Sequence, residues 1–236
     1  MPQIDERTEM LIGVDAKERL HQAKVAVFGL GGVGGTAFEA LLRSGVGTIY
    51  AVDCDVVDET NLNRQLLFAK ADIGKEKAVA AKERATAIRD DVNICSENYR
   101  IDENSLSCHD YSECDCLIDA VDDVAAKIAL IRYAAKSGKP ILVSLGMGNR
   151  LNPSKVELRR LDKTEGDPLA KKVRYECRQN GIDMKNVWCA VSTEEPLVRT
   201  NKPSSMMMVP SAAGLLLAYQ AIEIVAKPHA SDMLNE

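Results

Sequence analysis

Short apolar runs alternate along this chain with longer stretches in which apolar residues recur at helical spacing. The apolar runs lie at residues 25–28, 48–52, 92–95, 116–123 and 140–145. The helical stretches lie at residues 37–42, 73–89 and 124–137. Short apolar runs are typical of strands buried in a parallel sheet, and their alternation with helices is typical of α/β proteins. The pattern therefore predicts an α/β protein with a doubly wound, mainly parallel sheet.

The two ends of the chain show a different pattern. Residues 5–21 predict an N-terminal helical arm that carries Met10, Leu11 and Val14 on one face. The elements predicted beyond residue 145 are a linker at 146–154, a helix beginning at Asp167-Pro168, a strand at 186–192 and an apolar helix at 209–226. We expect these C-terminal elements to form a small extension of the same domain.

A glycine-rich turn follows the first predicted strand and precedes the first helix. Its glycines are Gly29, Gly31, Gly32 and Gly34. The first permits a tight turn, the next two let phosphates approach the backbone, and the last allows close packing of helix on strand. Asp53 ends the second predicted strand, where a carboxylate can accept hydrogen bonds from ribose hydroxyls. This combination predicts a nucleotide-binding site.

Composition limits the partners and the compartment. The net charge of −5 gives no overall attraction to nucleic acid, so any RNA contact needs a local basic patch. The polar N-terminus predicts no signal peptide, and the apolar run at 206–226 is interrupted by Pro210, Gln220 and Glu223, which favours a buried or interface helix over a membrane span. The seven cysteines are an odd number, which together with the predicted lack of a signal peptide predicts free thiols in a reducing cytoplasm. They include no Cys-x-x-Cys pair, which predicts no zinc site.

Two cations and a carboxylate accompany the predicted nucleotide site. Arg64 follows the second strand, Lys77 lies in the first turns of a helix, and Asp122 follows the fourth strand. Arg64 and Lys77 would neutralise charge that develops on phosphate oxygens, and Asp122 would hold Mg²⁺. A nicotinamide dehydrogenase would instead need a proton donor or acceptor for hydride transfer. These residues favour attack on a phosphate.

Five motifs that include these residues resemble those of the ThiF/MoeB/ubiquitin-activating superfamily of ATP-dependent adenylating enzymes. The motifs are Gly-x-Gly-Gly-Val-Gly at 29–34, Asp-Cys-Asp at 53–55, Thr-Asn-Leu-Asn-Arg-Gln at 60–65, Gly-x-x-Lys at 74–77 and Asp-x-x-Asp-Asp at 119–123. The similarity runs in consistent order over residues 7–145. It implies a Rossmann-like, ThiF/MoeB-type fold that adenylates a carboxylate and releases pyrophosphate.

The resemblance also implies the residues of the site. ATP would contact Gly29, Gly31, Gly32, Gly34, Asp53, Asp55, Asn61, Arg64, Gln65, Lys77, Asp122 and Asp123. The catalytic residues would be Arg64, Lys77 and Asp122, together with Arg7, which matches the arginine that family dimers insert into the partner subunit's site. A solvated charge is the alternative interpretation of Arg7. The implied protein is a homodimer of single domains, in which residues 1–145 form the ATP-binding core and residues 146–236 the substrate-binding and dimerisation part.

The most basic segment is 155–178, with eight Lys or Arg and five acids. The zinc-binding Cys-x-x-Cys pairs of ThiF and MoeB are missing, while 162–164, 167–172 and 192–194 resemble the branch of the superfamily that acts on tRNA. That branch activates the threonyl carboxylate of threonylcarbamoyladenosine beside the anticodon and closes it to a ring with loss of water. The tRNA contacts would be Arg159, Arg160, Lys163, Lys171, Lys172 and Arg174. A solvated face is the ordinary interpretation of such a charge run.

Several alternatives stay open from the sequence. Cys189 would either carry an acyl or sulfur intermediate or be a structural residue beside Trp188, and the structural role is favoured because ring closure within the substrate needs no covalent enzyme intermediate. The protein would otherwise adenylate the C-terminal glycine of a ubiquitin-like sulfur carrier, act as a non-catalytic partner of a cysteine desulfurase, or be a nicotinamide dehydrogenase. The sequence leaves open the general base and the binding of a monovalent cation.

Overall fold

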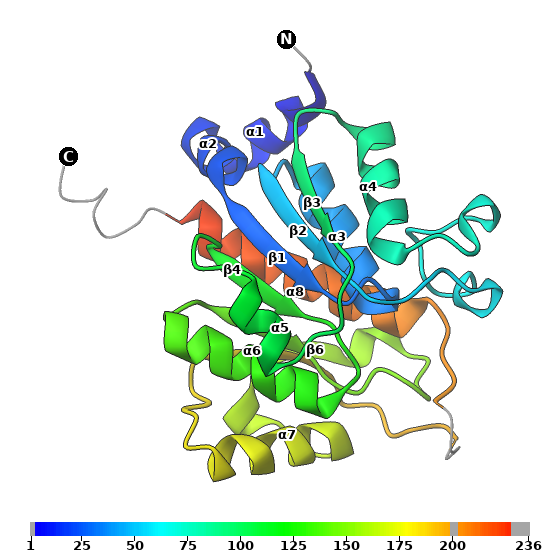
Figure 1. The fold of residues 1–236 in the computed structure, drawn as a ribbon, viewed down its shortest axis with the longest axis vertical. Helices are drawn as coiled ribbons and strands as arrows, with labels where there is room; N and C mark the ends of the chain where they lie inside the picture. Colours follow the sequence, from blue (N-terminus) through cyan, green and yellow to red (C-terminus); the bar gives the residue numbers. More distant parts are fainter. Residues whose placement is uncertain (1–2, 199–202, 228–236) are drawn as a thin grey trace, which may run out of the picture.

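A computed structural model describes residues 3–198 and 203–227 of the chain (Figure 1). The described residues form one seven-stranded sheet in the order β3-β2-β1-β4-β5-β7-β6. The strands are β1 (Lys24–Phe28), β2 (Thr48–Val52), β3 (Asn93–Glu97), β4 (Cys116–Asp119), β5 (Ile141–Ser144), β6 (Val156–Arg160) and β7 (Val187–Ser192). Neighbouring strands are parallel except for β6 and β7, which are antiparallel. The predicted doubly wound, mainly parallel sheet is confirmed.

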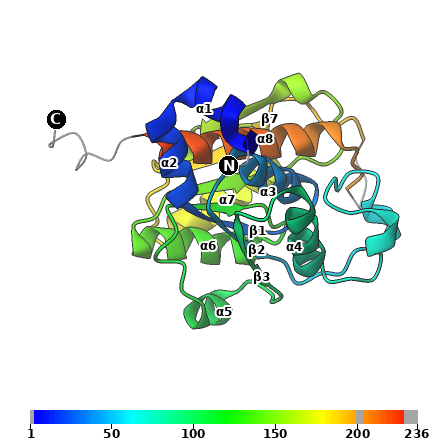
Figure 2. The same cartoon turned by 90° about the horizontal axis from the view of Figure 1, so that it is seen from above.

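Helices cover both faces of this sheet (Figure 2). One layer contains α3 (Gly32–Ser44), α4 (Lys77–Ile88) and α8 (Met208–Ala226). The other contains α5 (Glu103–Cys108), α6 (Val124–Ser137) and α7 (Pro168–Gln179). Short 3₁₀ helices are η1 (Gln3–Asp5), η2 (Glu59–Asn61), η3 (Lys70–Asp72), η4 (Pro153–Lys155) and η5 (Leu161–Lys163). Because the first strands of the sheet are all parallel, the loops after β1, β2, β3 and β4 lie at one edge and can build a common site.

Helix α8 is the one helix, within the described ranges, that is long and apolar enough to cross a membrane by length and composition alone. Ala213 and Leu217 on one side of it are buried in the layer that also contains α3. Thr36 of α3 donates a hydrogen bond from Oγ1 to Ser211 Oγ of α8 over 3.1 Å. Leu215, on another side, is exposed. The helix therefore contributes one side to the core and presents another at the surface.

The predicted N-terminal helical arm consists of two α-helices. Helices α1 (Glu6–Ile12) and α2 (Val14–Gln22) are separated by Gly13, whose φ of 84° is left-handed and interrupts the helix. Asp5 binds the arm to the rest of the domain, because its carboxylate accepts hydrogen bonds from Arg89 Nη1 and Nη2 at 2.9 and 2.8 Å. Burial alone would raise the pKa of Asp5, but the hydrogen bonds from Arg89 and His21 outweigh burial and lower that pKa.

Two other segments differ from the prediction. The helix expected from residue 73 begins at Lys77, since Gly74 is left-handed with a φ of 86°. Strand β6 was not predicted from the basic segment. Its Val156 and Leu158 pack on the core and alternate with polar residues, which is the pattern of a half-buried edge strand. The basic segment therefore supplies an edge strand as well as the predicted helix α7.

Candidate functional site

A glycine loop joins the end of β1 to the start of α3. Gly29 has a φ of 85°, and a Cβ added there would lie 2.8 Å from the carbonyl oxygen of Ala120. A Cβ added to Gly34 would lie 1.7 Å from the carbonyl oxygen of Gly29. Side chains at these two positions would force the loop away from α3 and from the turn after β4. Glycine therefore keeps the backbone N–H groups at the start of α3 close to the loop, an arrangement that suits a phosphate.

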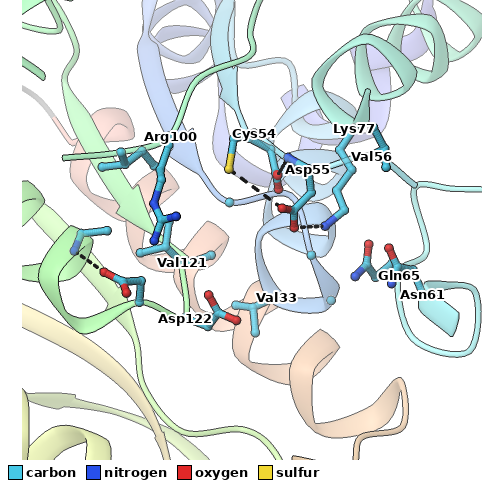
Figure 3. A pocket seen from close by; sticks show the side chains of 18 of the residues that line it. Val33, Cys54, Asp55, Val56, Asn61, Gln65, Lys77, Arg100, Val121 and Asp122 are labelled. Carbon is cyan, nitrogen blue, oxygen red and sulfur yellow. Dashed lines mark hydrogen bonds and ion pairs between the residues drawn. The ribbon is translucent and has the colours of Figure 1, made fainter. Parts of the chain in front are cut away.

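A cavity of about 590 Å³ lies at the carboxyl edge of the sheet, and we call it the strand-end cavity (Figure 3). Its volume is in the range of small-molecule sites. The residues predicted to contact ATP line it, with the exception of Gly34: they are Gly29, Gly31, Gly32, Asp53, Asp55, Asn61, Arg64, Gln65, Lys77, Asp122 and Asp123. The fold thus brings together residues from five separate stretches of the chain.

Asp53 connects the end of β2 to the glycine loop. The carboxylate is buried, and it accepts hydrogen bonds from Leu30 N at 2.6 Å and from Asp55 N at 2.8 Å. Burial raises the pKa of Asp53, and the charge of Lys77 with the two backbone N–H groups opposes the rise. Each carboxylate oxygen keeps a second lone pair. Asp53 can therefore hold the loop and accept a ligand hydroxyl at the same time.

Lys77 enters the strand-end cavity from the first turn of α4. Its Nζ lies 2.8 Å from Asp55 Oδ2, and its backbone N–H donates to Asp55 O at 3.0 Å. The lysine side chain is nearly buried while that of Asp55 is mostly exposed. An ammonium has three N–H donors, so Lys77 can bind Asp55 and still donate to a phosphate oxygen.

The segment after η2 forms another wall. Arg64 Nη1 donates to Thr60 O at 2.8 Å and to Asn63 Oδ1 at 2.9 Å, which fixes the guanidinium to its own loop. Gln65 is buried, and its Oε1 has no hydrogen-bond partner in the part of the chain that the structure describes. A buried polar atom without a partner is costly, and a polar ligand in the cavity would relieve that cost.

The turn after β4 presents Asp122 to the cavity, across from Lys77 (Figure 3). Asp122 is exposed and makes no hydrogen bond to the other described side chains or backbone groups. Asp123 caps α6, because its Oδ1 accepts a hydrogen bond from Ala126 N at 2.9 Å. Of the two acids, Asp122 has the freer carboxylate and is the better candidate to hold a metal ion.

A fully buried ion pair holds this turn, and no pattern in the sequence predicts it. Lys127 Nζ lies 3.1 Å from Asp119 Oδ1 and donates to Ser144 O at 2.7 Å, and both charged side chains are 0% exposed. Asp119 Oδ1 also accepts a hydrogen bond from Val121 N at 3.1 Å. The pair therefore connects β4, β5 and α6. Through the hydrogen bond from Val121 N, it also holds the turn that carries Asp122.

Sequence reasoning also missed the part of the wall that follows β3. Tyr99, Arg100 and Ile101 line the cavity. The ring of Tyr99 stacks on that of His109, with centroids 4.0 Å apart. Since β3 ends at the same edge as β1, β2 and β4, the rule that ligands gather at strand ends would have identified this segment.

The remaining predicted residues lie away from the cavity. Arg7 is exposed on α1 and does not line the cavity of its own chain. Lys163, Lys171 and Lys172 are exposed, whereas Arg174 donates a hydrogen bond to Thr164 Oγ1.

Arg159 and Arg160, two other predicted tRNA contacts, are consecutive in strand β6 and therefore lie on opposite faces of the sheet. Arg160 follows the alternation of Val156 and Leu158 and so lies on the α8 side, while Arg159 lies on the α7 side. Cys189 is 0% exposed in the core beneath α6 and α7, and burial raises its pKa. This environment favours a structural role for Cys189 over a reactive thiol.

Comparisons with known proteins agree on one family. The model of the ThiF family matches residues 6–235. A tRNA threonylcarbamoyladenosine dehydratase of Bacillus subtilis is 37% identical over 230 residues, which cover 89% of this chain and 90% of that protein. The crystal structure of the Escherichia coli tRNA N6-threonylcarbamoyladenosine dehydratase in complex with ATP is 30% identical, with a TM-score of 0.86 over 94% of this chain and 93% of that one. A probable adenylyltransferase/sulfurtransferase MoeZ of Mycobacterium tuberculosis is 36% identical over 130 residues, covering 55% of this chain and 33% of that protein.

Proposed function

The chain belongs to the ThiF family, and we propose that it is an ATP-dependent enzyme that activates the threonyl carboxylate of threonylcarbamoyladenosine in tRNA and cyclises it with loss of water. The observation that carries the proposal is the strand-end cavity, in which the glycine loop, Asp53, Arg64, Lys77 and Asp122 meet. The Bacillus subtilis protein and the Escherichia coli structure described above both match about nine tenths of the chain and carry the dehydratase name, and the sulfurtransferase relative matches only about half of it.

ATP binding follows from the donors and acceptors around the cavity. The triphosphate would lie on the glycine loop at the start of α3, and the ribose would donate to Asp53. Lys77 and Arg64 would donate to phosphate oxygens. Asp122 would hold Mg²⁺, which when bound neutralises charge on the triphosphate. The exposed Asp122 carboxylate and the unpartnered Gln65 Oε1 fit a polar ligand at this position.

The reaction would have two steps, and in each step a phosphate-containing group leaves with the electron pair of the bond that breaks. A carboxylate oxygen of the substrate attacks the α-phosphorus of ATP, and pyrophosphate leaves with the electron pair of the broken P–O bond. A nucleophilic atom of the carbamoyl group then attacks the acyl carbon, the carbamoyl group releases a proton to solvent, and AMP leaves with one oxygen of the original carboxylate. The nucleoside thus loses one water, and ATP becomes AMP and pyrophosphate. Positioning and charge stabilisation by the chain suffice for both steps.

A homodimer would complete the site. The arm exposes Met10 and Leu11 at 81% and 85%, and α8 exposes Leu215 and Tyr219. Large exposed apolar side chains of this kind are typical of interfaces. Arg7, which is exposed on the same arm, would reach the cavity of the partner subunit and donate to its phosphates. Mixing Arg7→Ala subunits with inactive Arg64→Ala subunits should then restore part of the turnover, and no restoration would argue against the shared site.

The two parts of the domain would have different roles. Residues 1–145 would bind ATP, and residues 146–236 would supply the tRNA surface and part of the dimer contact. The whole reaction would take place in the cytoplasm, where its tRNA substrate is available. A cysteine desulfurase is a further partner that we propose on the family resemblance alone.

The test is nucleoside mass spectrometry on tRNA that carries threonylcarbamoyladenosine, after incubation with the protein and Mg-ATP. We expect a mass loss of one water in that nucleoside, only with ATP present and not with Arg64→Ala. Pyrophosphate release stimulated instead by a small protein ending in Gly-Gly, with the nucleoside unchanged, would overturn the proposal.

A further inference from the structure

Helix α7 has one face in the core and one face exposed to solvent. Ala170, Val173 and Cys177 are all 0% exposed and pack against the sheet and α6. Arg174, between these two faces, is engaged with Thr164. The exposed residues of the helix are Pro168, Lys171, Lys172, Tyr175, Arg178 and Gln179. Arg174, one of the predicted tRNA contacts, is therefore not free to bind a ligand in this conformation. Arg178 and the ring of Tyr175, which were not predicted as contacts, are exposed on the outward face.

Tyr175 is the feature that a solvated charged face does not explain. Its side chain is 56% exposed. Lys171 lies four residues before it and Arg178 three residues after it, so both are its neighbours on the helix surface. No ion pair engages Lys171, Lys172 or Arg178 within residues 3–198 and 203–227. An exposed ring beside three cations that form no ion pair among the described residues is complementary to a polyanion that also presents aromatic bases.

The helix is fixed to the edge of the sheet that carries the strand-end cavity. Asp167 is buried, and its Oδ2 accepts a hydrogen bond from Gly146 N at 2.9 Å, just beyond β5. Its Oδ1 caps the helix by accepting from Leu169 N and Ala170 N at 2.7 and 3.1 Å. At about 1.5 Å per residue, Tyr175 lies roughly 12 Å along the helix from this cap. The ring is therefore held on a rigid element that begins at the carboxyl edge of the sheet.

We propose that the outward face of α7 binds single-stranded RNA and that the ring of Tyr175 stacks on an unpaired nucleobase of that RNA. The inference rests on the proposed function, which makes a tRNA loop the substrate. Sequence-tolerant stacking on an exposed aromatic ring is the usual way in which proteins hold unpaired bases, and Lys171, Lys172 and Arg178 would contact the flanking phosphates. Arg160, on the opposite face of the sheet, takes no part in this surface.

Tyr175→Ala and Tyr175→Phe test the stacking, with Lys171→Ala as the charge variant and Lys82→Ala on α4 as the matched control. The measurement is the Kd of the full-length protein for tRNA carrying threonylcarbamoyladenosine, at several salt concentrations. Tyr175→Ala should weaken binding about tenfold with an unchanged salt slope, since stacking releases no counterions. Tyr175→Phe should bind like wild type, and Lys171→Ala should lower the salt slope by about one. Lys82→Ala should change neither quantity.

The outcomes separate the inference from the proposed function. If wild type binds the tRNA and Tyr175→Ala binds equally well, the stacking inference is wrong and the proposed function stands. If wild type does not bind the tRNA at low salt, the proposed function itself fails. If Tyr175→Ala instead weakens tRNA and ATP binding together, the ring has only a structural role and the inference is overturned.

Discussion

The strand-end cavity and the outward face of α7 are both polar, but they are built in opposite ways. In the cavity, the fold holds Asp53 by two backbone N–H groups, Lys77 by Asp55, and the turn that carries Asp122 by the buried pair of Asp119 and Lys127. On α7 the cations extend into solvent without ion pairs among the described residues, around an exposed tyrosine. Fixed charges suit a reaction in which charge develops at defined atoms, whereas mobile cations suit a long, flexible polyanion.

The largest expected effect comes from breaking the buried pair. Lys127→Met leaves the charge of Asp119 unpaired in the core, which should lower the free energy of unfolding by about 3–5 kcal/mol. Adding Asp119→Asn removes that charge and should recover much of the loss. Urea denaturation measures both variants. A single variant as stable as wild type would mean that the pair does not hold the turn.

Removing a cation from the cavity should affect turnover more than stability. Arg64→Ala takes away a donor to the phosphates and should lower kcat by about 10²–10³-fold or more, a loss typical of a missing donor to developing negative charge. Its thermal midpoint should stay near that of wild type, because the guanidinium is bound only to its own loop. Unchanged turnover would remove Arg64 from the site.

Charge reversal on α7 should affect RNA binding and spare ATP binding. The double variant Lys171→Glu/Lys172→Glu replaces attraction to phosphates by repulsion and should weaken tRNA binding by at least about tenfold with a smaller salt slope. ATP affinity, measured by calorimetry on the same protein, should be unchanged. Equal loss of both affinities would erase the contrast between the two regions.

The smallest effect concerns the arm and depends on pH. The pKa of Asp5 is lowered from its usual 3.8 by Arg89 and His21, although burial opposes the shift. A carboxylate with a lowered pKa stabilises the folded arm above its unfolded pKa and loses that contribution as pH falls through the folded value. Limited proteolysis of the arm should therefore accelerate below about pH 3.8 relative to neutral pH. In Asp5→Asn the arm should be cut more readily at neutral pH, with little further change on acidification.

The sequence predicts the cavity well because its residues follow from a local rule. Gly29 and Asp53 each come directly after an apolar run and Asp122 lies at the end of another, and parallel strands bring such positions to one edge. The predicted bounds of β2 and α6 agree with the structure for the same reason, since their periodicity is local.

What the sequence does not predict depends on tertiary contacts. The pairing of Asp119 with Lys127 is completed by the carbonyl of Ser144, a residue of another strand. Strand β6 is short and exists because β7 offers it an edge. The inward position of Arg174 depends on the loop that carries Thr164. The ion pair and the Arg174 contact leave no periodic pattern in the sequence, and the alternation in β6 covers only 5 residues.

The central claim is that the strand-end cavity adenylates a carboxylate of an RNA nucleoside. The most direct test uses tRNA whose threonyl carboxylate carries ¹⁸O, with Mg-ATP and the protein, followed by mass spectrometry of the nucleotide products. Attack of the carboxylate on the α-phosphorus predicts that one ¹⁸O appears in AMP as the nucleoside loses water. Label in orthophosphate together with ADP, or water loss with no label in AMP, would contradict the account.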